Sequence, residues 1–158
     1  MEDVDYCNDP RDVCVYEGVT EALTKLRDAG FENIIITNQA GIARGRITSE
    51  QYESVHAALL DKLGPSLIRA VYFCPDFGPR RKPSPEMVFE AARDFDLDLA
   101  RSFFVGDKAI DVECGRNAGV RAILVQTGYG VTQTDCGADF VAKDLAAAAD
   151  YILENARA

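Results

Sequence analysis

The feature of this sequence that most constrains its fold is the alternation of short apolar runs, rich in β-branched residues, with amphipathic helical segments. Their periodicity predicts strands at 33–37, 70–73, 102–105, 121–125 and 139–142. Start and stop signals predict helices at 18–29, 48–63, 84–95, from the turn after 105 to 117, and 144–155. Repeated strand–helix units favour a three-layer, Rossmann-like α/β fold, with a mostly parallel sheet and helices on both faces.

The connections between these elements are short, so we expect one domain over residues 1–158, without a large cap domain. In such folds, functional residues gather at the carboxyl ends of the strands. The polar residues that follow the predicted strands are therefore the first candidates for a site.

Charge and cysteine content exclude several function classes. The formal net charge of −9 argues against nucleic-acid and anionic-membrane partners. No apolar run approaches the roughly 20 residues of a membrane span, and no segment has the form of a signal peptide, so the cytoplasm is the expected location. A monomer that acts on a small-molecule phosphate ester is expected. Five scattered cysteines without a C-x-x-C pair indicate reduced thiols. The one histidine, His56, lies in a predicted helix, which disfavours Ser-His-Asp chemistry.

The first polar cluster follows the strand at 33–37. Thr37, Asn38 and Gln39 bring a hydroxyl and two amides to the end of a buried strand, and glycines and Arg44 follow them. Uncharged donors and accessible backbone N–H groups suit an oxyanion. The alternative is a polar loop of turn residues.

The second cluster is the basic run Arg80, Arg81 and Lys82, which Pro83 ends. In an acidic chain, a basic loop stiffened by prolines can hold an ammonium against a phosphate. The alternative, which is favoured when the run is taken alone, is a solvated basic loop.

The third cluster lies where the strand at 102–105 ends. Gly106 and Asp107 follow the strand directly, and Asp111 comes four residues after Asp107. One or two carboxylates, with water and substrate phosphate, form the usual shell of Mg²⁺. The alternative is that Asp107 caps the next helix.

The order of these clusters is more specific than any one of them. A threonine at one strand end, then a lysine, then Gly-Asp-x-x-x-Asp at a later strand end resembles motifs two, three and four of the haloacid-dehalogenase superfamily. The strings TNQAGIARG, RKPSPEM and VGDKAID are similar to the D-glycero-D-manno-heptose 1,7-bisphosphate phosphatases and the related histidinol-phosphate phosphatases. The resemblance extends over nearly the whole chain.

The resemblance implies a role for each matched residue. Thr37 and Lys82 would be catalytic, because they bind and neutralise the transferring phosphoryl group. Asp107 would bind Mg²⁺, and Asp111 would support the metal shell. The implied substrate-binding residues are Asn38, Gln39, Arg44, Arg81 and Lys108.

The chain departs from the family pattern at its start. Family members begin with a hydrophobic strand that ends in Asp-x-Asp-Gly-Thr, in which the first aspartate attacks phosphorus and the second is the general acid and base. Asp3 and Asp5 have the right spacing, but no apolar strand precedes them and no Gly-Thr follows. We therefore expect that the first strand and its nucleophile are missing, either through a start-site error or truncation or through true loss.

A second departure concerns zinc. The family often carries a Cys/His zinc loop before the motif-three lysine. Cys74 resembles its first ligand, but residues 75–80 supply no further cysteine or histidine. No zinc is expected.

The sequence and its resemblance therefore predict a Mg²⁺-dependent phosphatase that acts on a small phosphate monoester, and a sugar phosphate such as heptose 1,7-bisphosphate is the expected substrate. The alternatives are a histidinol-phosphate phosphatase and an inactive remnant that binds phosphate without turning it over.

Overall fold

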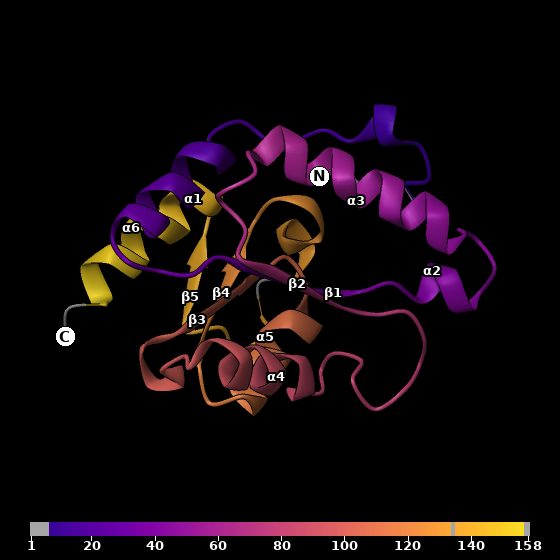
Figure 1. Ribbon diagram of the computed structural model, residues 1–158. Helices are drawn as coiled ribbons and strands as arrows, with labels where there is room; N and C mark the ends of the chain where they lie inside the picture. The colour runs from indigo at the N-terminus through magenta and orange to yellow at the C-terminus, as the bar shows by residue number, and fades with distance from the viewer. Residues whose placement is uncertain (1–6, 134, 157–158) are drawn as a thin grey trace. The chain divides into compact units, whose positions relative to one another are not determined.

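The structure is a computed structural model that describes residues 7–133 and 135–156 (Figure 1). Its contacts divide the chain into two compact units, Met1–Gly78 and Pro79–Ala158. None of the described helices is both long and apolar enough to cross a bilayer. The single domain expected over residues 1–158 stays a prediction.

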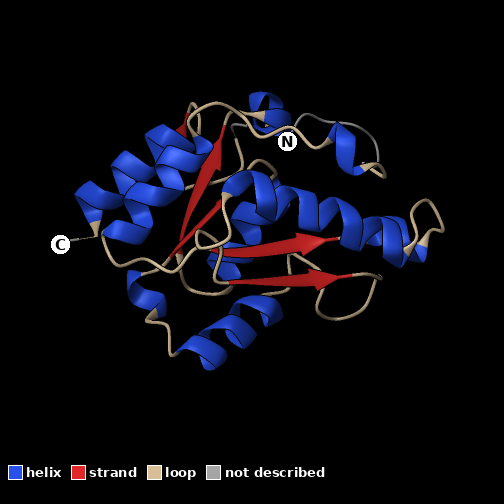
Figure 2. Ribbon diagram, turned by 45° about the horizontal axis from the view of Figure 1, so that its top comes forward, coloured by secondary structure: helices blue, strands red, loops and turns tan. Residues whose placement is uncertain are grey.

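The first unit contains a two-stranded parallel sheet. Its elements are η1 (Pro10–Asp12), α1 (Val19–Asp28), β1 (Ile34–Asn38), α2 (Ala40–Ala43), α3 (Ser49–Leu63) and β2 (Ala70–Cys74). The strands β1 and β2 lie side by side and run in the same direction (Figure 2). The register places Thr37 opposite Phe73 and Asn38 opposite Cys74, so the polar end of β1 is held beside the end of β2.

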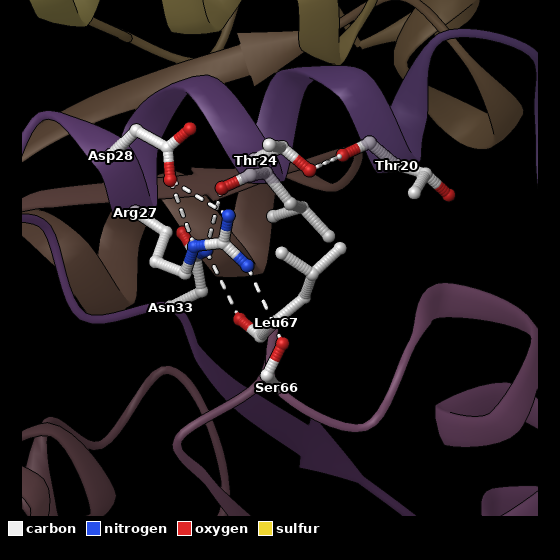
Figure 3. Close-up of polar contacts among 8 residues, drawn as sticks. Thr20, Thr24, Arg27, Asp28, Asn33, Ser66 and Leu67 are labelled. Carbon is white, nitrogen blue, oxygen red and sulfur yellow. Dashed lines mark hydrogen bonds and ion pairs between the residues drawn. The ribbon is translucent and has the colours of Figure 1, made fainter.

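The entry to β1 is fixed by Asn33 (Figure 3). Its side-chain amide donates to the carbonyl of Leu23 in α1 at 3.0 Å and to the carbonyl of Leu67, which precedes β2, at 3.1 Å. Arg27 of α1 also reaches the hydroxyl of Ser66 at 3.4 Å. Because one amide satisfies carbonyls on both sides of the strand, the position at which β1 begins is set before any ligand binds.

The long helix α3 begins as its sequence predicts. The Thr48 hydroxyl accepts a hydrogen bond from the backbone N–H of Gln51, and the Gln51 side chain accepts one from the backbone N–H of Thr48. This reciprocal capping box satisfies two donors at the helix start, and the loss of such a cap costs about 1 kcal/mol. Gly64, with φ of 106°, ends the helix, as expected.

The second unit contains a three-stranded parallel sheet in the order β3-β4-β5. Its elements are α4 (Glu86–Phe95), η2 (Leu99–Arg101), β3 (Phe103–Gly106), α5 (Ala109–Asn117), β4 (Arg121–Val125), η3 (Gly128–Thr132), β5 (Phe140–Ala142) and α6 (Leu145–Asn155). Figure 1 shows α5 and α6 on different sides of this sheet.

The middle strand β4 forms the core of the second unit. Ala122, Ile123 and Leu124 are completely buried. Helix α5 lies close against the sheet because Gly115 faces it: a Cβ at that position would lie 2.7 Å from the Cβ of Phe104. The helix that follows β3 is therefore held tightly to the strand that carries the candidate site.

The predicted α/β fold with parallel strands is confirmed, and the predicted strands and long helices match within one or two residues. Two details differ. The strands form two parallel sheets, since within the described residues neither β1 nor β2 pairs with β3, β4 or β5. The alternative that Asp107 caps the next helix is wrong, because Lys108 is the N-cap and the Asp107 carboxylate is bonded elsewhere.

Candidate active site

A buried ion pair in the second unit joins Lys82 to Asp111. The Lys82 ammonium lies 2.6 Å from Oδ1 of Asp111, and the side chains are only 11% and 7% exposed. The ammonium also lies 5.8 Å from the centroid of the Phe104 ring. A buried pair of this kind is retained only if its charges compensate each other, because either charge alone is costly to desolvate.

Asp111 is held in place from two sides. It lies in the first turn of α5, where Oδ2 accepts a hydrogen bond from the backbone N–H of Lys108 at 3.2 Å. At the end of β3, Gly106 leaves room for the carboxylate, because a Cβ there would lie 2.3 Å from the Cβ of Asp111. The glycine in Gly-Asp-x-x-x-Asp is thus explained by the closeness of the second aspartate.

The loop that carries Lys82 is tied to α5. The thiol of Cys114 donates to the carbonyl of Ser84 at 3.3 Å, and the Asn117 side-chain amide donates to the carbonyl of Pro83 at 3.0 Å. Burial raises the pKa of the Cys114 thiol to about 11, so at neutral pH it is a neutral hydrogen-bond donor. Neither residue was identified from the sequence, because the contacts join segments that are far apart in the chain.

Asp107 follows β3 and is held by the segment after β4. Its Oδ2 accepts a hydrogen bond from the backbone N–H of Tyr129 at 3.2 Å. Gly128 passes very close, because a Cβ at that position would lie 2.5 Å from the same oxygen. Within the described residues, Oδ1 of Asp107 is the oxygen left for another ligand.

Lys108 contacts the same segment. Its ammonium lies 3.9 Å from the centroid of the Tyr129 ring, which is within the range of a cation–π interaction. Tyr129 was not singled out from the sequence. The available signal was an aromatic residue between two glycines directly after a buried strand.

The two arginines of the basic run differ in their surroundings. Arg80 forms an ion pair with Glu90 of α4, with its Nη2 2.6 Å from Oε2. Arg81, the predicted substrate-binding residue, is half-buried. Ion pairs therefore join the basic loop to α4 and α5. The solvated-loop alternative does not describe Lys82, whose side chain is only 11% exposed, whereas the Arg80 side chain is 41% exposed.

The other predicted site residues lie in the first unit. The Thr37 hydroxyl accepts a hydrogen bond from the Gln39 side-chain amide at 3.1 Å. The backbone N–H of Gln39 donates to the carbonyl of Cys74 at 2.7 Å. Asn38 ends β1, and the Arg44 guanidinium lies 5.2 Å from the Phe77 ring centroid. The convergence of Thr37 with Lys82 and Asp107 stays a prediction.

The turn after Cys74 is closed by an aspartate. The Cys74 thiol donates to the backbone carbonyl of Asp76 and to its Oδ1, both at 3.4 Å, and the backbone N–H of Gly78 donates to Oδ1 at 2.8 Å.

Among residues 7–133 and 135–156, no three histidine, cysteine or acidic side chains gather as a metal cluster. Asp3 and Asp5 lie outside the described residues.

Comparison with known proteins agrees with this fold. A family model described as HAD-hydrolase-like matches residues 79–148. The chain is 38% identical to the D-glycero-D-manno-heptose-1,7-bisphosphate 7-phosphatase of Thermosynechococcus vestitus, over 96% of this chain and 89% of that protein. It is 39% identical to the enzyme of the same name from Chlorobaculum tepidum, over 94% of this chain and 86% of that protein.

A solved structure is similarly close. The D,D-heptose 1,7-bisphosphate phosphatase from B. bronchiseptica, complexed with magnesium and phosphate, superposes with a TM-score of 0.88 and is 29% identical. The match covers 98% of this chain and 92% of that chain.

The fold and these matches define a hydrolase of the phosphomonoesterase class. More narrowly, the chain belongs to the HAD-like family that includes the D-glycero-D-manno-heptose-1,7-bisphosphate 7-phosphatases.

Proposed function

We propose that the chain removes a phosphate group from a small sugar bisphosphate of the D-glycero-D-manno-heptose 1,7-bisphosphate type, and that it requires Mg²⁺. The observation that carries this proposal is the buried Lys82–Asp111 pair at 2.6 Å, which keeps an ammonium in the position that the family resemblance gives to the motif-three lysine. The names of the relatives support the choice of substrate.

The chemistry of the donors fits Mg²⁺. Asp107 supplies a hard carboxylate oxygen, and its second oxygen is already fixed by the backbone N–H of Tyr129. Both oxygens of Asp111 are engaged by Lys82 and by the backbone of Lys108, which suits a supporting role and not direct coordination. When bound, the ion would neutralise charge on the phosphoryl oxygens.

The chain's own residues would bind and orient the phosphoryl group. The Lys82 ammonium would neutralise a phosphoryl oxygen, and Asp111 would hold that ammonium in position. The Thr37 hydroxyl would donate to another oxygen, and the Gln39 amide would orient the hydroxyl. The attacking group would be an aspartate carboxylate that forms an aspartyl-phosphate, from the Asp-x-Asp-Gly-Thr motif that the printed sequence lacks.

The test is phosphate release from heptose 1,7-bisphosphate, fructose 1,6-bisphosphate and histidinol phosphate, measured with Mg²⁺ and with EDTA. It uses this chain and a version extended at its N-terminus by the strand and Asp-x-Asp-Gly-Thr motif of a relative, because the attacking aspartate belongs to that motif. We expect the extended version to release phosphate fastest from heptose 1,7-bisphosphate and only with Mg²⁺. Asp107→Asn should reduce release at least about 100-fold, while Lys143→Met, a change at an exposed lysine, should not.

Other outcomes identify the alternatives. A preference for histidinol phosphate would assign the chain to that activity. Binding of heptose 1,7-bisphosphate in calorimetry without any phosphate release would favour a remnant that binds phosphate. No release and no binding of any of the three compounds would overturn the proposal.

A further inference from the structure

Tyr129 contacts two of the predicted site residues at once. Its backbone N–H donates to Oδ2 of Asp107 at 3.2 Å, and its ring lies 3.9 Å from the Lys108 ammonium. Asp107, the proposed metal ligand, and Lys108, a proposed substrate-binding residue, are adjacent in the sequence. Tyr129, in the segment after β4, contacts both of them.

The two glycines on either side of Tyr129 fix its position. Gly128 has φ of 59°, and a Cβ there would lie 2.5 Å from Oδ2 of Asp107. A Cβ at Gly130 would lie 1.8 Å from the backbone carbonyl oxygen of Val125, at the end of β4. The segment is therefore pressed against the carboxylate on one side and against β4 on the other, and Tyr129 between them has little freedom to move.

We propose that Tyr129 is a positioning residue for substrate binding: its ring confines the Lys108 ammonium while its backbone confines the Asp107 carboxylate. The inference rests on the proposed function, in which Lys108 contacts the substrate.

The physical reason is the freedom of a lysine side chain. A lysine has four rotatable side-chain bonds, and ordering it at the moment of binding weakens affinity. A ring that holds the ammonium beforehand removes part of this cost, and it does so without neutralising the charge. An acidic partner would also hold the ammonium, but it would compete with a phosphate for it.

The first measurement does not depend on substrate. In wild type and in Tyr129→Phe, the ring current should move the NMR signals of the Lys108 ε-methylene protons upfield. In Tyr129→Leu these signals should return to the position of an exposed lysine such as Lys143, which is 79% exposed. Unchanged Lys108 signals in Tyr129→Leu would overturn the inference, whatever the substrate is.

The second measurement is the Kd of heptose 1,7-bisphosphate in the presence of Mg²⁺, by calorimetry. Tyr129→Leu should raise the Kd about two- to five-fold, the strength of one cation–π contact, and Tyr129→Phe should restore the wild-type value. Lys108→Met should raise the Kd at least as much, and adding Tyr129→Leu to it should have no further effect.

The outcomes separate the two proposals. If wild type does not bind heptose 1,7-bisphosphate, the proposed substrate is wrong, and the role of Tyr129 toward that substrate falls with it. If wild type binds but Tyr129→Leu and Tyr129→Phe bind equally well, only the inference about Tyr129 is overturned. A Mg²⁺ affinity that is the same in Tyr129→Leu and wild type would confirm that the backbone contact to Asp107 survives the loss of the ring.

Discussion

The Lys82 ammonium and the Asp111 carboxylate form a buried ion pair at 2.6 Å, between the loop that precedes α4 and the first turn of α5. Breaking such a pair from one side leaves an uncompensated buried charge, whereas removing both charges can be nearly neutral. The pair therefore makes the stability of the second unit depend on two residues that are also proposed to serve the site.

Lys82→Met should destabilise the protein by about 3–5 kcal/mol, because the Asp111 carboxylate loses its partner. The double variant Lys82→Met/Asp111→Asn should recover much of this loss, since no unpaired charge is left. Urea unfolding of the two single variants and the double variant measures the coupling free energy.

Lys143→Met is the matched control for this double-mutant cycle of Lys82 and Asp111. Its ammonium lies 3.8 Å from Asp144 and is 79% exposed, so we expect a change below about 0.5 kcal/mol. If Lys82→Met cost no more than Lys143→Met, the Lys82–Asp111 pair would not hold the fold as described.

Gly106→Ala should disturb the same pair without touching either charge. The new Cβ would lie 2.3 Å from the Cβ of Asp111, so the aspartate must move. We expect a loss of about 1–3 kcal/mol and, in that background, a smaller coupling free energy between Lys82 and Asp111. In Gly119→Ala, where φ is 76° and nothing lies near the added Cβ, the coupling should be unchanged; equal coupling in both backgrounds would contradict the close contact.

Cys114 should resist alkylation in the native protein, whereas Cys14 should react. Cys114 is completely buried, and burial raises its pKa to about 11, so the reactive thiolate is scarce at pH 8. Cys14 is exposed. Iodoacetamide labelling mapped by mass spectrometry checks this; rapid labelling of Cys114 before unfolding would show that its hydrogen bond to Ser84 is not maintained.

His56 should titrate below its ordinary value, because burial lowers its pKa from 6.5. A lowered pKa means that the unfolded chain takes up the proton first. The free energy of unfolding should therefore be unaffected by His56 above pH 6.5 and should fall as the pH drops through the folded-state pKa.

As the single histidine, His56 can be followed by NMR without assignment. His56→Gln should remove this part of the acid sensitivity. A measured pKa above 6.5 would contradict the half-buried position of the ring beside Tyr52, with which it stacks at 5.7 Å.

The sequence predicted the elements that local rules specify. The Thr48 capping box and the end of the helix at Gly64 follow from short-range hydrogen bonding and backbone conformation, and both are present. The helix α2 was missed, because a four-residue helix built from AGIA has too few residues for a periodic pattern.

The candidate site could be predicted only in part, because local rules do not specify contacts between distant segments. The three strand-end clusters could be located, since polar residues after buried strands stand out in the sequence. The contacts of Lys82 with Asp111 and of Tyr129 with Asp107 could not, because they join segments that are distant in the chain and depend on how helix and sheet pack. The glycines at 106, 128 and 130 can be read from the sequence, but the cause of each one cannot. Each is required because a Cβ at that position would clash with an atom of another segment.

The two hydrogen bonds from α5 to the segment after Lys82 bear on how this protein can be recombined with its relatives. Cys114 and Asn117 donate to the backbone carbonyls of Ser84 and Pro83, which any residue at 83 and 84 would also offer. A chimera that takes residues 83–84 from a relative should therefore keep both bonds, whereas one that takes residues 114–117 should lose each bond whose donor side chain is not retained.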